Sequence, residues 1–149
     1  EYKFDDIFFG RTIFDWVKFA HEFNCKSNGW DVYELKPGAF GFDNIAVSLC
    51  EAMAFVQESP DDDTALTENE LAAQIHIGWS KTYLLWRDVG PYEFGNGYRK
   101  QYTMLGDERR NNLAMSSYED LPEDEKEKDL IFARFLIGEL KLLKARCAQ

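Results

Sequence analysis

The spacing of apolar residues predicts two helices in the first third of the chain. After Gly10, apolar side chains recur at steps of three and four residues, which predicts a helix over residues 12 to 23. A second helix is expected to begin at Asp43 or Asn44, because either side chain can cap its first turn, and to end near Val56.

Two further helices are predicted in the rest of the chain. Residues 68 to 86 repeat apolar positions at helical spacing. Before them, Thr67 and Glu70 form a capping-box pattern, in which each side chain accepts a hydrogen bond from the backbone amide of the other residue. A last helix is expected from Pro122 to about Ala145, since the missing N–H of proline costs nothing in a first turn.

Two segments have patterns typical of strands. Residues 30 to 35 (WDVYEL) alternate large apolar and polar side chains, which predicts a short strand. Residues 91 to 104 predict a β-hairpin, because Asn96 and Gly97 supply the positive φ angles of a tight turn, and residues 106 to 112 are expected to form a polar loop. We therefore expect all 149 residues to form one α+β domain, mainly helical, with about four helices and a small antiparallel β element.

The negative charge of the chain is concentrated in two segments. The sequence has 17 Lys and Arg against 27 Asp and Glu, which gives a formal net charge of −10. Residues 58 to 70 contribute −6 and residues 119 to 129 contribute −5, so the remainder is close to neutral. Such runs are usually a solvated face or the first turn of a helix, with imitation of a phosphate backbone as the alternative. The acidity argues against general nucleic-acid binding.

The sequence shows no sign of a membrane or secreted protein. No apolar run approaches the roughly 18 residues that span a bilayer, and the N-terminus lacks the pattern of a signal peptide. The three cysteines are widely spaced, which predicts neither a disulfide framework nor a zinc knuckle. We expect a soluble cytoplasmic protein.

Residues that commonly build catalytic or metal centres show no recognised spacing. His21 and His76 are the two histidines, and neither has a second ligand at metal-site spacing. Residues 61 to 63 (DDD) lack the glycine and glutamate of a calcium loop, and Gly-Asn-Gly at 95 to 97 fits a turn better than a phosphate cradle. The sequence predicts no cofactor and no catalytic residue, and a nucleotide hydrolase stays an open alternative.

An aromatic stripe runs along the third predicted helix. His76, Trp79, Tyr83 and Trp86 follow one another at steps of three and four residues, so they lie on one helix face. A core stripe is the simpler interpretation. The alternative is a binding cleft, because aromatic rings near basic side chains can stack on a nucleobase while the cations meet its phosphates.

The C-terminal half resembles a known family. Residues 118 to 132 (YEDLPEDEKEKDLIF) resemble the Y-x-x-L-P-x-x-x-K-x-K-D-x-x-F signature of ryanodine-receptor repeat (RyR) domains, especially the short bacterial and phage versions. Residues 46 to 54 are similar to an earlier helix of that family, and residues 76 to 79 are similar to its H-x-x-W helix. The resemblance covers roughly residues 45 to 140, whereas residues 1 to 44 are an extension without a counterpart.

The resemblance implies a compact domain of helices with a small β element and no catalytic role. In the receptors these domains are non-catalytic modules, and one repeat pair holds an adenine nucleotide in an aromatic cleft. The small microbial versions look like proteins of phage and host-defence contexts with nucleotide-derived ligands. On the motif positions, Trp79 and Tyr118 match, and Trp86 approximates a further family tryptophan.

We therefore expect a non-enzymatic RyR-like binding module, encoded by a phage or active in host defence, that captures a nucleotide-like small molecule through an aromatic cleft. The candidate ligand-binding residues are Trp79, Trp86 and Tyr118 for stacking, His76 for a hydrogen bond, Arg99 and Lys100 for a phosphate, and Tyr92.

An acidic protein-interaction module is the competing hypothesis. Such a protein would inhibit a host enzyme or form part of a larger phage particle or assembly. Aromatic residues among the first forty positions, such as Phe14 and Phe19, would then form a partner surface or the seam of a homo-oligomer. Both hypotheses expect a protein of the host cytoplasm or the virion, with no membrane contact.

Overall fold

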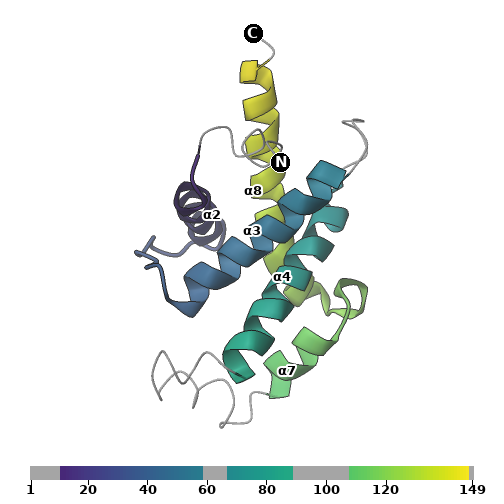
Figure 1. The fold of residues 1–149 in the computed structure, drawn as a ribbon. Helices are drawn as coiled ribbons and strands as arrows, with labels where there is room; N and C mark the ends of the chain where they lie inside the picture. Colours follow the sequence, from purple (N-terminus) through teal and green to yellow (C-terminus); the bar gives the residue numbers. More distant parts are fainter. Residues whose placement is uncertain (1–10, 59–66, 89–107, 148–149) are drawn as a thin grey trace.

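Five α-helices and one short 3-10 helix make up the described part of the chain (Figure 1). The structure is a computed structural model, and it describes residues 11–58, 67–88 and 108–147. In chain order the elements are α2 (Ile13–Ser27), α3 (Phe40–Glu58), α4 (Glu68–Asp88), α7 (Glu108–Met115), the 3-10 helix η2 (Tyr118–Asp120) and α8 (Glu123–Cys147).

The predicted α+β class is wrong, because the described residues are all-α. Residues 30 to 35, predicted as a strand, form no regular element between α2 and α3. Trp30, Val32 and Tyr33 in this segment are 56%, 45% and 58% exposed, so the alternation of side chains does not create a buried face against which a strand could pack. The predicted hairpin over residues 91 to 104 lies outside the described residues.

The four predicted helices are confirmed, with ends that differ by a few residues. The capping box at the start of α4 is present as expected. Thr67 Oγ1 accepts from the Glu70 amide at 3.1 Å, and Glu70 Oε1 accepts from the Thr67 amide at 3.0 Å. By contrast, α3 begins at Phe40, one turn before the expected Asp43 or Asn44.

The polar loop predicted over residues 106 to 112 is wrong for its described part, because helix α7 begins at Glu108. This helix has eight residues, and Ala114 is its one buried residue, with Leu113 partly buried against the core. Two apolar positions are too few to produce a helical period that can be detected in the sequence. The helix depends on its contact with α4 rather than on a pattern of its own.

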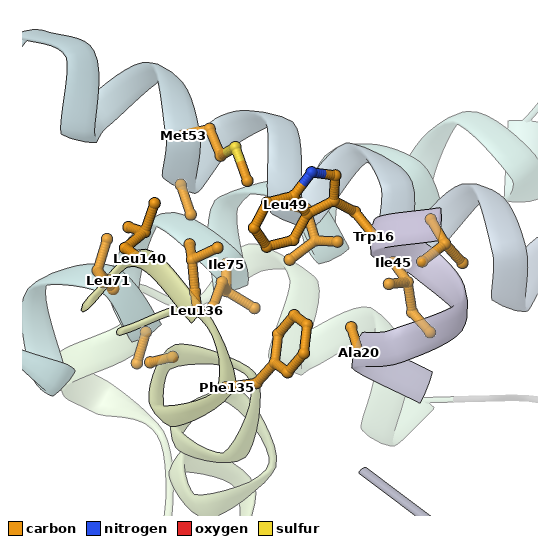
Figure 2. Packing of buried hydrophobic residues seen from close by; sticks show 14 of the residues in the cluster. Trp16, Ala20, Ile45, Leu49, Met53, Leu71, Ile75, Phe135, Leu136 and Leu140 are labelled. Atoms are coloured by element: carbon orange, nitrogen blue, oxygen red, sulfur yellow. The ribbon is translucent and has the colours of Figure 1, made fainter. Parts of the chain in front are cut away.

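Helices α2, α3, α4 and α8 enclose the core (Figure 2). In Figure 1, α3 and α4 run side by side, and α8 passes behind them. No helix in the described ranges is both long and apolar enough to cross a membrane. The core side chains labelled in Figure 2 are Trp16 and Ala20 from α2, Ile45, Leu49 and Met53 from α3, Leu71 and Ile75 from α4, and Phe135, Leu136 and Leu140 from α8.

The contact between α3 and α4 depends on a glycine. A Cβ atom at Gly78 would lie 2.5 Å from Ser48 Cα and 2.8 Å from Ser48 N, a separation that side chains do not tolerate. Next to this contact, Ser48 Oγ donates to the Ile75 carbonyl at 3.2 Å. The close approach fixes the position of α4 and of the aromatic residues that it carries.

Candidate functional site

A cavity of about 370 Å³ lies between the helices, lined by residues from all five of them and from the segment that joins α2 to α3. Its volume is at the small end of the range of about 300 to 1,000 Å³ that is typical of ligand pockets. Apolar and polar side chains both line it, which is also typical of sites that bind one small molecule.

Helix α4 supplies the aromatic wall of the cavity. The His76 and Trp79 rings are near-parallel, with centroids 6.0 Å apart, and Trp79 and Tyr83 stack with centroids 5.3 Å apart. Tyr83 is fully buried, and its hydroxyl donates to Asn111 Oδ1 at 2.9 Å. His76 and the half-buried Trp79 line the cavity. Within the described part of the stripe, Tyr83 therefore belongs to the core, and His76 and Trp79 form a wall of the cavity.

His76 is held in one orientation. Its Nε2 lies 2.8 Å from the Ser116 carbonyl oxygen, and because a carbonyl only accepts, Nε2 carries the proton. The other ring nitrogen, Nδ1, lies 3.6 Å from Asp129 Oδ2 on α8. This histidine therefore connects α4 to α8 and to the turn after α7, while its ring borders the cavity.

Asp129 has an unusual protonation state for a carboxyl group. Burial, and then the negative charge of Glu125, raise its pKa to about 8, although Lys128 acts in the opposite direction. The carboxyl group is therefore mainly neutral at pH 7, and its contact with His76 is not an ion pair in spite of the short distance. A neutral carboxyl group offers the cavity both a hydrogen-bond donor and an acceptor.

Cations gather where α7 meets the first turns of α8. Arg109, Arg110 and Lys128 line the cavity, together with the carboxyl groups of Glu125 and Asp129. Arg109 Nη1 lies 2.7 Å from Glu125 Oε2, and Lys128 Nζ lies 3.1 Å from Glu125 Oε1. Arg109 and Lys128 share the Glu125 carboxylate, so this end of the cavity offers cationic groups to an anionic ligand.

The segment between α2 and α3 closes another side of the cavity. His21 Nε2 donates to the Tyr33 carbonyl at 2.8 Å, and the two rings meet edge to face with centroids 4.5 Å apart. On α3, the Asn44 side-chain amide lies 3.5 Å from the Trp79 carbonyl. The first two contacts hold the segment on α2, and the third joins α3 to α4.

The structure brings together two of the residues predicted for the site. His76 and Trp79 both line the cavity, whereas Tyr118 does not. Tyr118 is buried in the core, where its hydroxyl donates to Asn69 Oδ1 at 2.8 Å and Lys126 Nζ lies 5.6 Å from the ring centroid. The other predicted residues lie outside what the structure describes, namely the side chain of Trp86 and all of Tyr92, Arg99 and Lys100.

Sequence reasoning missed the polar residues of the cavity. Glu125, Lys128 and Asp129 belong to the charged start of the last predicted helix, a pattern that is normally solvated. Arg109 and Arg110 fall in the segment that was expected to be a loop. The sequence feature that could have marked these residues is the pair of adjacent arginines, in a segment with few other cations. It does not show which carboxylate the arginines contact in the fold.

Comparisons with known proteins place no further constraint on this site. No protein-family model, curated protein or solved structure matches the chain significantly. The resemblance to RyR domains stays a prediction from the sequence. Across the described ranges, no group of three or more His, Cys, Asp and Glu side chains could hold a metal ion.

Proposed function

We propose that the protein is a non-enzymatic module that binds a nucleotide-like small molecule in the cavity beside α4. One observation supports this proposal above the others: a single cavity is lined both by the aromatic pair His76 and Trp79 and by the cations Arg109, Arg110 and Lys128. Aromatic rings and cations around one cavity are what a base and its phosphate require of a binding site.

The cavity is prepared for such a ligand before binding. Trp79 is in ring contact with His76 and Tyr83, and His76 is fixed by the Ser116 carbonyl, so little side-chain freedom is lost on binding. The neutral carboxyl group of Asp129 can donate to a ring nitrogen of a base and accept from an amino group. In this proposal His76 positions the ligand and takes part in no catalytic step.

The setting proposed for the protein follows from the sequence resemblance. A small RyR-like module of a phage or a host-defence system would meet its ligand in the cytoplasm.

Removal of the Trp79 ring is expected to weaken binding of the ligand. In calorimetric titrations with AMP, cyclic AMP and ADP-ribose, the wild-type protein should bind at least one compound, and Trp79→Ala should bind it about tenfold more weakly, since loss of the contact between the indole and the base costs roughly 1.5 kcal/mol. Leu85→Ala is the matched control, because Leu85 is an exposed residue of the same helix that does not line the cavity. Absence of heat with every compound, or equal affinity in the Trp79 variant, would contradict the proposal.

The exposed apolar side chains of α2 and of the segment after it favour a second candidate function, that of a protein-interaction module. Phe14, Phe19 and Phe23 of α2 are 54%, 37% and 37% exposed, and Trp30 and Val32 in the following segment are 56% and 45% exposed. Exposed aromatic groups of this kind commonly form contacts with another protein. The partner would be a host enzyme, a component of a larger assembly or a second copy of the chain.

Charges introduced into the region formed by α2 and the segment after it test this second function. If the protein self-associates through it, sedimentation velocity should show a wild-type species larger than a monomer, and the double variant Phe14→Asp and Val32→Asp should be monomeric. Leu142→Asp, at an exposed position on α8, is the control and should behave as the wild type. A wild-type monomer at all concentrations would exclude the homo-oligomer.

A further inference from the structure

We infer that Glu125 is an internal competitor for the anionic group of the ligand, which displaces it from Arg109 and Lys128. This inference rests on the proposed binding function and states which group of the ligand the charged end of the cavity binds. The class of ligand is then a small molecule with a phosphate or carboxylate group, and the two cations bind that group.

The geometry of Glu125 resembles that of a bound anion. Each of its carboxylate oxygens faces a different cation, Oε2 at 2.7 Å from Arg109 Nη1 and Oε1 at 3.1 Å from Lys128 Nζ. Short contacts of this kind are those that cationic side chains make with phosphates and carboxylates. The cations thus already have the spacing that an anionic group needs.

The exposure of the three side chains leaves the cations accessible. The Glu125 side chain is 14% exposed, whereas the side chains of Arg109 and Lys128 are 54% and 64% exposed. The carboxylate is enclosed at the cavity wall, and the cations extend to its solvent edge. A ligand that enters the cavity can therefore contact both cations.

The balance of charge favours exchange of one anion for another. Both cations are exposed to solvent, which weakens their attraction to Glu125, and an entering phosphate can contact both of them at once. Arg110 also lines the cavity. A phosphate, which carries more charge than a carboxylate, can therefore replace Glu125 with a net gain.

Removal of the Glu125 charge is the direct test. Glu125→Gln keeps the size of the side chain and is expected to bind AMP about tenfold more tightly than the wild type in calorimetric titrations at low salt, because the competitor is lost. Adenosine, which has no phosphate, should bind both proteins equally. Lys128→Gln should weaken AMP binding about tenfold. The control is Lys81→Gln, since Lys81 pairs with Glu51 away from the cavity, and it should change neither affinity.

The outcomes separate this inference from the proposed function. If AMP binds and Glu125→Gln leaves its affinity unchanged, or tightens adenosine equally, the inference is wrong while the binding function stands. If AMP does not bind the wild type, the melting temperatures of Glu125→Gln and Lys81→Gln are compared with and without inorganic phosphate. A larger rise on addition of phosphate for Glu125→Gln supports the anion site, and equal rises overturn it. If Glu125→Gln does not fold, the effect of Lys128→Gln on AMP binding decides, with weaker binding in support and equal binding against.

Discussion

Replacement of Gly78 with alanine is expected to lower the free energy of unfolding by about 3 kcal/mol. The added Cβ would lie 2.5 Å from Ser48 Cα and 3.0 Å from the Val47 carbonyl oxygen. These are backbone atoms, so no side-chain rotation can relieve the clash, and α3 and α4 must separate. The separation would loosen the core and the aromatic wall of the cavity together.

Urea titration of Gly78→Ala measures this effect, with Gly138→Ala as the matched control. Gly138 is an exposed residue of helix α8, and a Cβ there meets no atom within 4 Å. Alanine at this position should stabilise the helix by up to about 1 kcal/mol. Equal and small effects of the two substitutions would show that α3 and α4 do not approach as closely as described.

Replacement of Asp129 with asparagine is expected to remove a large part of the pH dependence of stability. In the folded protein the pKa of Asp129 is raised to about 8, chiefly by burial, from the ordinary value of 3.8. Between these two values the folded state binds a proton that the unfolded state has released. The contribution of Asp129 to stability is therefore complete below about pH 4 and is lost as the pH rises to about 8.

The measurement compares the stability of the wild type and Asp129→Asn across this pH range. Asparagine resembles the neutral carboxyl group in shape. As the pH rises through this range, the free energy of unfolding of the variant should therefore increase relative to that of the wild type by up to about 1.4 kcal/mol per pH unit. Asp124→Asn, which changes an exposed carboxylate on the same helix, is the control and should keep the wild-type slope. Parallel curves for the wild type and the Asp129 variant would mean that this carboxyl group is charged in the folded protein.

The sequence was sufficient to predict those elements whose signal is local. Helical spacing of apolar residues identified four helices, and the hydroxyl of Thr67 with the carboxylate of Glu70 marked the start of α4. Local patterns misled where the outcome depends on a partner. Residues 30 to 35 alternate as a strand does, but no other described strand pairs with them, and His21 holds the Tyr33 carbonyl instead.

The candidate site could be predicted in part, for a related reason. The aromatic spacing on α4 identified His76 and Trp79, because residues three apart on one helix share a face. The polar end of the cavity is formed by contacts between helices, such as the one from Arg109 on α7 to Glu125 on α8. Such contacts leave no periodic signal, and Asp129 looks like any other acid near a helix start until its burial is known.

An NMR titration of the ¹⁵N-labelled protein with AMP shows at single residues whether the cavity beside α4 binds a nucleotide-like anion. Binding in this cavity should shift the signals of the Trp79 indole N–H and the Asn44 side-chain amide, which both line it, and should shift that of the fully buried Trp16 much less. The absence of any shift, or shifts confined to the outer surface of α2 around Phe14, would contradict it.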